Sequence, residues 1–185
     1  MTDLSVGRKK ENMESWDILN RNGKPTGRTV SRMCPILRRG EYHLVVHIWT
    51  VDGRGNVLIQ RRSDQKPLMP GEWAATGGAA VSGEASRFAA CRELKEELGI
   101  TKARDELVYV TRMVRRNSLV DIYLTFTDCD PADLVLQEDE VAEVKWVSTK
   151  ELADMVSRGE FHNYGKEYFE KLFAAFETKG KVAVK

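Results

Sequence analysis

The stretch GAAVSGEASRFAACRELKEELGI, residues 78–100, combines an amphipathic helix pattern with a group of glutamates. Apolar side chains recur in it at three- and four-residue spacing, which predicts a helix from Glu84 to Leu98. The next residue, Gly99, stands where glycine commonly ends a helix. We expect the apolar stripe to pack against the rest of the domain. The stripe consists of Phe88, Cys91, Leu94 and Leu98.

The glutamates of this helix fall on a different side from the apolar stripe. At about 100° per residue, Glu93, Glu96 and Glu97 lie within about 100° of one another. Like charges at this spacing repel one another unless a cation lies among them. Mg²⁺ prefers hard oxygen ligands and is commonly shared between carboxylates and substrate phosphates. The pattern therefore predicts a Mg²⁺ site, with Mn²⁺ as the alternative metal, and an Arg92 that pairs with Glu96 or orients a carboxylate.

The same stretch matches the pattern G-x5-E-x7-R-E-U-x-E-E-x-G-U at every specified position, where U is an aliphatic residue. The matching residues are Gly78, Glu84, Arg92, Glu93, Leu94, Glu96, Glu97, Gly99 and Ile100. This pattern is the signature of the Nudix hydrolases, and the chain resembles that family over about residues 40–158. The resemblance implies an α/β/α sandwich that hydrolyses a nucleoside diphosphate linked to another moiety.

The resemblance also implies roles for individual residues. Glu93, Glu96 and Glu97 correspond to metal ligands, and Glu93 also to a catalytic base. Glu84 corresponds to a supporting carboxylate, and the carbonyl of Gly77 to a further metal ligand. The residues themselves support this reading, because Gly77 and Gly78 let the backbone approach a phosphate closely.

Members of this family usually recruit another acid from a loop that follows the signature. The segment QEDEVAEVKW, just before an expected strand, offers the candidates. We favour Glu140 as the additional catalytic residue. The other candidates are Glu138, Asp139 and Glu143.

Arginines near the signature are candidates for binding the substrate phosphates, because a guanidinium can grip phosphate through two parallel hydrogen bonds. Arg61 and Arg62 are adjacent on an expected strand, and Gly78 completes the expected substrate-binding set. A second group comprises Arg112, Arg115 and Arg116. Alternate residues of a strand point to opposite faces, so we expect about half of these arginines to face away from a ligand.

Strands and helices alternate on both sides of the signature. Residues 16–30 read as a hairpin whose Asn22-Gly23 turn supplies a positive φ, and residues 43–62 read as a second hairpin. The other expected elements are strands near 106–114, 119–127 and 143–147, and helices over 149–158, capped by Ser148, and 165–178. This order predicts the α/β class: a Nudix-type α/β/α sandwich with a mixed β-sheet and an extra N-terminal β-hairpin.

Composition bounds the domain organisation and the partners. The chain has 185 residues, and we expect a flexible arm over 1–14, a single domain over 15–178 and a flexible tail over 179–185. The formal net charge of +1 provides no field that would recruit nucleic acid or a membrane, so the expected partner is a small-molecule diphosphate. A homodimer is left open.

The cysteine pattern bears on the cellular compartment. Three widely spaced cysteines without a CxxC pair indicate reduced, mostly buried thiols, and no signal-peptide or membrane-spanning run is visible. We therefore expect a cytoplasmic location. Trp49, Trp73 and Tyr123 could stack on a nucleobase, although aromatic residues in strands more commonly pack in the core or at its rim.

An alternative activity comes from the flanking segments. The N-terminal hairpin, the segment 41–63 and PGEWAATGG resemble the subgroup of the family that is similar to isopentenyl-diphosphate isomerases. That chemistry moves a proton across an alkene, and the subgroup uses a Cys and, two residues later, a His. The matching positions here are Gly77 and Ala79, and His43 stands without its partner ligands. We therefore favour hydrolase over isomerase, and keep a catalytically inactive nucleotide-binding domain as a third reading.

Overall fold

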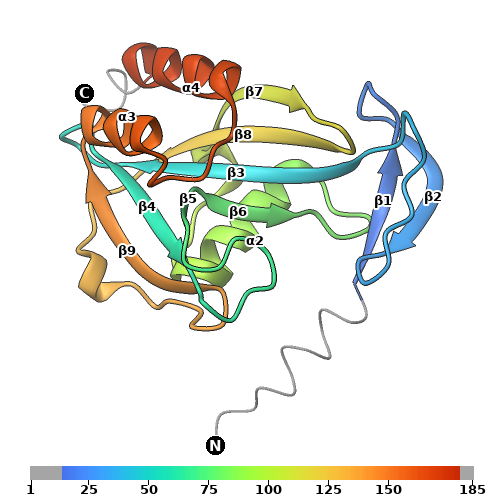
Figure 1. Cartoon of the computed structure of the whole chain (residues 1–185), viewed down its shortest axis with the longest axis horizontal. Coiled ribbons are helices and arrows are strands. Elements are labelled where there is room, and N and C mark those ends of the chain that lie inside the picture. The colour runs from blue at the N-terminus through green and yellow to red at the C-terminus, as the bar shows by residue number, and fades with distance from the viewer. Residues whose placement is uncertain (1–13, 180–185) are drawn as a thin grey trace, which may run out of the picture.

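A mixed β-sheet forms the centre of the molecule, here a computed structural model that describes residues 14–179. Its central path runs β5-β4-β3-β8-β7, while β6 pairs with β3 and β9 pairs with β4 (Figure 1). The strands are β3 (His43–Val51), β4 (Val57–Arg62), β5 (Trp73–Ala74), β6 (Thr76–Ala79), β7 (Val108–Val114), β8 (Ser118–Phe126) and β9 (Val141–Val147).

Strand β3 is central because it is apolar on both faces. It runs parallel to β8 over its whole length, from His43 opposite Ser118 to Val51 opposite Phe126. Trp49 packs into the core on one face of the sheet, whereas Ile48 packs into the core on the other. A strand covered on both faces has no need of polar alternation, which explains the nearly continuous apolar run in this part of the sequence.

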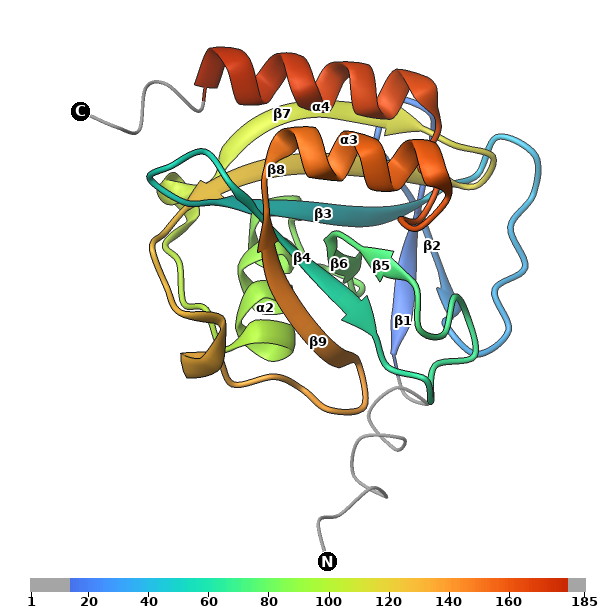
Figure 2. The same ribbon diagram turned by 60° about the vertical axis from the view of Figure 1, so that its left-hand side comes forward.

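Helices cover both faces of this sheet, which confirms the predicted sandwich (Figure 2). On one face lies α2 (Ser86–Leu98), and on the other lie α3 (Thr149–Arg158) and α4 (Lys166–Lys179). Gly99 ends α2 in the left-handed conformation, as predicted. The predicted cap of α3 is also confirmed, because Ser148 Oγ accepts a hydrogen bond from the Glu151 backbone N–H at 3.0 Å.

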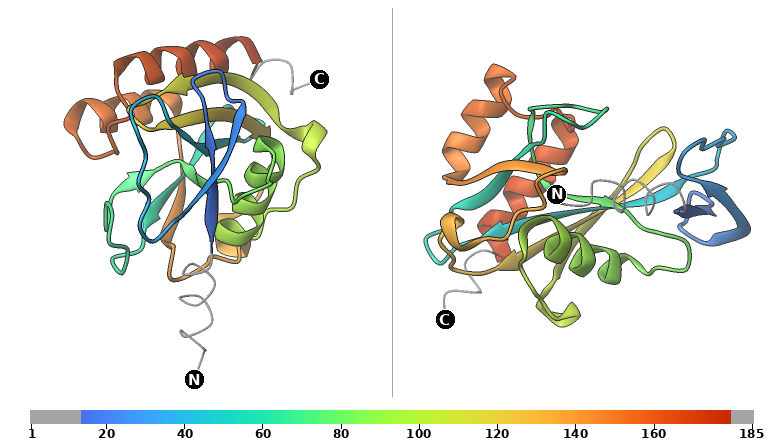
Figure 3. Two further views of the ribbon diagram at one scale, coloured as in Figure 1. Left: turned by 90° about the vertical axis from the view of Figure 1, so that its right-hand side faces the viewer. Right: turned by 90° about the horizontal axis from the view of Figure 1, so that it is seen from below.

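The N-terminal hairpin is a separate two-stranded sheet at one end of the molecule (Figure 3). It consists of β1 (Ser15–Leu19) and β2 (Pro25–Ser31), and Gly23 in its turn has the predicted positive φ, 77°. Leu19 packs with Tyr42 and Leu119, which docks the hairpin on the main domain. This placement puts the hairpin beside the loop that precedes α2.

Two details of the α2 prediction are corrected by the structure. The helix begins at Ser86, so Glu84 lies in the preceding loop. Phe88 is 50% exposed rather than buried, with the guanidinium of Arg104 over its ring. The buried side of α2 instead comprises Ala89, Ala90, Leu94 and Leu98 together with Glu93 and Glu97. The carboxylates are therefore drawn into the interior beside the apolar stripe.

The cysteines also differ from the expectation, because Cys34 is exposed and Cys91 and Cys129 are half-buried; all are free thiols. Within residues 14–179, no helix is long and apolar enough to cross a membrane. The predicted arm and tail fall almost wholly outside the described residues and stay predictions.

Candidate active site

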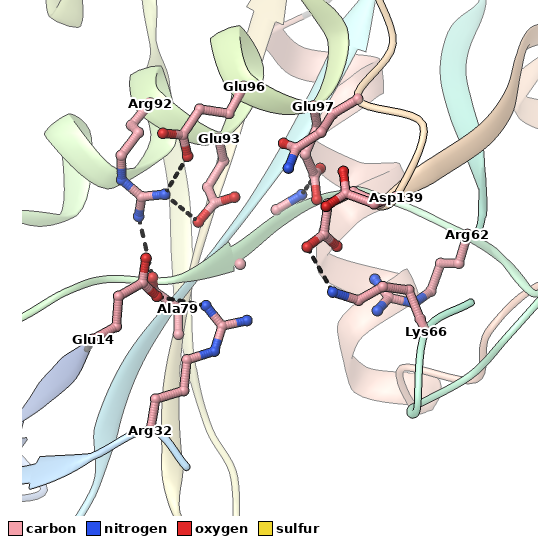
Figure 4. Close-up of a pocket in the computed structure, with 14 residues that line it drawn as sticks. Glu14, Arg32, Arg62, Lys66, Ala79, Arg92, Glu93, Glu96, Glu97 and Asp139 are labelled. Carbon is pink, nitrogen blue, oxygen red and sulfur yellow. Dashed lines mark hydrogen bonds and ion pairs between the residues drawn. The ribbon is translucent and has the colours of Figure 1, made fainter. Parts of the chain in front are cut away.

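A pocket of about 390 Å³ opens where α2, β6 and two loops meet (Figure 4). Most of its acids come from α2 and from the loop before β9, and its basic groups come from β4, from the β4–β5 loop, from the segment after β2 and, in Arg92, from α2 itself. The lining residues are Glu14, Arg32, Arg62, Lys66, Gly77, Gly78, Ala79, Arg92, Glu93, Glu96, Glu97, Gln137, Asp139 and Glu140. The structure thus gathers most of the site residues predicted from the sequence.

Two glycines of β6 permit close approaches, Gly77 to the backbone of β3 and Gly78 to the Glu93 carboxylate of α2. A Cβ on Gly78 would lie 2.5 Å from Glu93 Oε1, and a Cβ on Gly77 would lie 2.0 Å from the Val46 carbonyl oxygen. Gly77 also has a φ of +150°, a backbone conformation that residues other than glycine rarely adopt. Both positions therefore require glycine for the helix, the sheet and the carboxylates to meet.

Glu97 is the most deeply buried acid of the pocket, with an exposed fraction of 3%. Its Oε2 accepts hydrogen bonds from Gln60 Nε2 at 3.0 Å and from the Gly77 backbone N–H at 3.1 Å. Gln60 is in turn held by Thr76, whose hydroxyl donates to Gln60 Oε1. Burial and the nearby charge of Glu93 raise the pKa of Glu97, against the opposing effect of the Gln60 hydrogen bond.

Arg92 holds three acids of the signature in place. Its Nε and Nη2 each lie 2.9 Å from one oxygen of Glu84, and its Nη1 lies 2.9 Å from both Glu93 Oε1 and Glu96 Oε2. Burial raises the pKa of Glu93, whereas the neighbouring Arg92 charge lowers it. Arg92 thus orients carboxylates, as predicted, and its Nη2 also donates to the Ala79 carbonyl.

These donors fit a hard divalent cation. Glu93, Glu96, Glu97, Glu140 and Asp139 all line the same pocket, and carboxylate oxygens are the ligands that Mg²⁺ prefers. Two of them, Glu93 and Glu97, are buried, and burial raises the pKa of both, so a metal would relieve the electrostatic cost of their charged forms. Within residues 14–179 no three acids are already gathered as a closed metal cluster, because Glu93 and Glu96 face Arg92 and Glu97 faces Gln60.

The loop before β9 contributes two of the four candidate acids. Glu140 lines the pocket and pairs with Lys66, whose Nζ lies 2.6 Å from Glu140 Oε1. Asp139 lines the pocket as well. Glu138 is exposed and does not line it, and Glu143 faces Arg61 at 3.3 Å instead.

Strand geometry separates the two adjacent arginines of β4. Arg62 lines the pocket on the same face of β4 as Gln60, and its Nε donates to the Leu68 carbonyl. Arg61 points to the opposite face, where it pairs with Glu143 and Asp64, so its predicted role in this pocket is not supported. The difference follows from the two-residue period of a strand.

The second group of predicted arginines lies elsewhere, and so do the aromatics. Arg112 forms two hydrogen bonds to Asp121, at 2.6 and 2.8 Å, and Arg115 lies over the ring of Tyr164. None of the lining residues of the pocket comes from the 112–116 segment. Trp49 and Tyr123 are buried core residues, which is the more common role of aromatic residues in strands. Trp73 lies half-buried under the Lys145 ammonium.

Sequence reasoning missed several residues of this site. Glu14 and Arg32 reach the pocket from the N-terminal hairpin and pair with each other at 2.7 Å. Lys66 and Gln137 enter from loops without any periodic pattern. Gln60, which holds Glu97, was also missed, although its place in the sequence offered one indication of its role. A polar residue inside the apolar run VLIQRR indicates a buried polar partner.

The residues expected of an isomerase have no counterpart here. Residues 77–80 read Gly-Gly-Ala-Ala, with neither Cys nor His. His43 lies outside the pocket and stacks on Trp16 with ring centroids 3.9 Å apart. Burial lowers the pKa of His43 to about 4, so the ring is neutral and packed.

Comparisons with known proteins agree with this geometry. The chain is 39% identical over 157 residues to the Nudix hydrolase lin0387 of Listeria innocua, covering 82% of this chain and 90% of that one. It is 31% identical over 144 residues to an isopentenyl-diphosphate Delta-isomerase of Saccharopolyspora erythraea, covering 72% of each. The crystal structure of DR0079 from Deinococcus radiodurans shares the fold, with a TM-score of 0.70 and 24% identity over 85% of this chain and 96% of that one. Residues 41–172 match the NUDIX domain, so the chain belongs to the Nudix family and is a hydrolase of diphosphate bonds.

Proposed function

We propose that this protein is a Mg²⁺-dependent hydrolase that cleaves the diphosphate linkage of a nucleoside diphosphate or of a small molecule linked to one. The observation that carries the proposal is the pairing of buried carboxylates, Glu93 and Glu97, with basic side chains in one pocket. A bound metal would offset the negative charge of the diphosphate and would activate water for attack. Mn²⁺ offers similar oxygen-preferring chemistry and would serve as a substitute.

The chain's own residues divide the work. Glu93, Glu96 and Glu97, with the carbonyl of Gly77, would hold the metal, and Arg92 fixes the orientation of Glu93 and Glu96. Gln60 and the Gly77 N–H keep the Glu97 carboxylate turned toward the sheet. This framework is assembled before the substrate arrives, so little reorganisation is needed during the reaction.

Hydrolysis adds water across one P–O–P linkage. The water oxygen bonds to phosphorus, the bridging P–O bond breaks, and the departing phosphate carries away the electron pair. The carboxylate of Glu93 accepts one proton of the water in this scheme, since burial raises its pKa and strengthens it as a base. Glu140 is the alternative acceptor, because it lies in the same pocket and is held by Lys66.

Basic side chains on opposite walls suit the two phosphates. Arg62 and Lys66 line the pocket from the β4 side, and Arg32 lines it from the hairpin side (Figure 4). Guanidinium groups can each engage a phosphate through two hydrogen bonds. A compact diphosphate that spans these walls accounts for their placement around the acidic helix.

A metal-dependent substrate screen tests the proposal. Nucleoside diphosphates, nucleotide sugars, dinucleoside polyphosphates, dNTPs, CoA derivatives and capped RNA would be incubated with Mg²⁺, with Mn²⁺ or with excess chelator, and phosphate or nucleotide release measured. We expect turnover of a small diphosphate only with metal, and slower decapping of RNA. Full turnover in excess chelator, or decapping faster than every small substrate, would refute the proposal.

The isomerase reading has its own test. No conversion of isopentenyl diphosphate to the dimethylallyl isomer is expected, because residues 77–80 offer no thiol or imidazole to move a proton. Appearance of the dimethylallyl isomer in an NMR assay would contradict the hydrolase assignment.

A further inference from the structure

A second cavity, which we call the basic cavity, lies at the hairpin end of the molecule and has a volume of about 630 Å³. Three segments meet there: the β1–β2 turn, the segment before β3 and the β7–β8 turn (Figures 1 and 2). The residues that line it are Arg21, Leu37, Arg38, Arg39, Gly40, Tyr42, Val114, Arg115, Arg116 and Asn117. It shares no lining residue with the pocket of the candidate active site, which we call the catalytic pocket.

The charge of this cavity is strongly unbalanced. Five of its lining residues are arginines and none is an acid. The whole chain has a formal net charge of +1, so the rest of the molecule carries 1 − 5 = −4. Glu41, which lies between two lining residues, is paired with Arg28 and with the Arg38 backbone N–H, and the charge of Arg38 also helps to lower its pKa. The positive charge is therefore concentrated in one place, and Glu41 offsets only part of it.

Most of these guanidinium groups are available to a ligand. Arg21, Arg39 and Arg116 are exposed, and none of them forms an ion pair within residues 14–179. Arg115 is half-buried and held over the rings of Tyr164 and Tyr168, with Nη2 donating to the Tyr164 carbonyl. One arginine is thus fixed at the wall of the cavity, while others can close on an anion from solvent.

The shape and the other lining groups narrow the ligand class. One guanidinium group can donate two parallel hydrogen bonds to the oxygens of a phosphate. Several arginines around one cavity can therefore bind a ligand with more than one phosphate. Asn117 adds hydrogen-bonding groups, and Leu37 and Val114 add apolar surface. A concave site suits a compact ligand that fits inside it, rather than a flat membrane surface.

We propose that the basic cavity is a second binding site, separate from the catalytic pocket, for a compact polyphosphorylated anion. Its five arginines bind the phosphates, and its apolar wall contacts any small organic group that the ligand carries. The segment that supplies Arg38 and Arg39 begins with Arg32, a residue of the catalytic pocket, so one stretch of chain borders both sites.

Inorganic tripolyphosphate is the probe, measured by isothermal titration calorimetry on the full chain in excess chelator. Excess chelator removes the metal that would bridge the probe to the carboxylates of the catalytic pocket. We expect one site whose affinity falls with rising salt. The double variant Arg39→Ala/Arg116→Ala should bind about tenfold more weakly or worse, because each lost guanidinium removes charge-assisted hydrogen bonds. Glu97→Gln should bind as the unaltered chain does.

The matched control is Arg54→Ala, an exposed arginine of the β3–β4 turn that lines neither cavity. Its affinity for tripolyphosphate should stay within about twofold of the unaltered chain. Because Arg39 and Arg116 are exposed, the double variant should keep the unaltered thermal midpoint.

Three outcomes would overturn the proposal. One is the absence of tripolyphosphate binding. Another is an equal loss of affinity in Arg54→Ala and in the double variant. The last is binding to phosphatidylinositol-phosphate vesicles or to RNA that depends on Arg39 and Arg116 while tripolyphosphate does not bind, which would assign the surface to a macromolecule.

Discussion

The catalytic pocket and the basic cavity hold charges of opposite sign and hold them in different ways. The main acids of the catalytic pocket come from one helix, and Glu93 and Glu97 are buried. The arginines of the basic cavity come from three segments distant in sequence, and all except Arg115 are exposed. Burial makes the glutamate charges costly until a cation arrives, whereas the arginines stay hydrated until an anion displaces water. A local motif thus gathers the proposed metal ligands, whereas the chain topology brings together the arginines of the proposed anion site.

The largest expected effect is at Glu97, the most deeply buried acid of the catalytic pocket. Glu97→Gln keeps the shape and can still accept the hydrogen bonds of Gln60 and Gly77, but it removes the charge that would hold the metal. We expect kcat to fall by about three orders of magnitude. Because burial disfavours this carboxylate, the metal-free variant should melt no lower than the unaltered chain.

Steady-state kinetics and thermal melts would measure both effects. Glu138→Gln is the control, since Glu138 is exposed and outside the pocket, and it should retain its rate. A Glu97→Gln rate within tenfold of the unaltered rate would mean that the buried charge does not hold the metal.

The next effect concerns Gly78, whose lack of a side chain leaves room for the Glu93 carboxylate of α2. An alanine methyl at Gly78 would sit 2.5 Å from Glu93 Oε1, so the Glu93 carboxylate must move. Gly78→Ala should lower kcat by about a hundredfold and the free energy of unfolding by roughly 1–3 kcal/mol. Kinetics and denaturant titration check these values.

Gly53→Ala provides the comparison for this change, because its methyl would meet nothing closer than 3.4 Å. Near-equal losses of activity in the two variants would show that the close approach of β6 and α2 does not matter to the chemistry.

A smaller effect separates the two faces of β4. Arg62→Ala should raise KM about tenfold with a lesser change in kcat, because Arg62 lines the pocket and would grip a substrate phosphate. Arg61→Ala is the matched control, because its side chain pairs with Glu143 on the other face. Arg39→Ala in the basic cavity should also leave KM near the unaltered value. A larger KM effect from Arg61 than from Arg62 would contradict the proposal that Arg62 is the arginine of β4 that contacts the substrate.

Sequence alone predicted the parts of the molecule that depend on local pattern. The signature located α2 and its carboxylates, and the Asn-Gly turn and the Ser148 cap were confirmed because short-range backbone chemistry decides them. Phe88 was misplaced because three- and four-residue spacing does not reveal that the approach to β6 draws Glu93 inward. Arg32 and Lys66 could not be found, since loop contacts from distant segments leave no period in the sequence.

The smallest expected effect lies on the sheet face covered by α3 and α4, opposite the face that carries α2. His47 is buried there, with Nδ1 2.9 Å from the Tyr168 hydroxyl, and burial lowers its pKa to about 3, assisted by the charges of Arg115 and His162. The pKa in the folded state is thus below the unfolded value of 6.5, so the unfolded chain binds more protons between these values. His47 therefore contributes stability that is fully present above about pH 6.5 and is lost as the pH falls toward 3. At pH 5.5 this loss should be about 1 kcal/mol, measured by denaturant titration at several pH values.

His43, whose pKa is about 4, also makes the protein less stable as the pH falls. The decisive quantity is therefore the difference between His47→Gln and the unaltered chain in how steeply the free energy of unfolding changes with pH. A shallower slope in the variant would identify His47 as a source of acid sensitivity independent of the catalytic carboxylates. Identical slopes would mean that other groups, such as His43, carry the acid sensitivity.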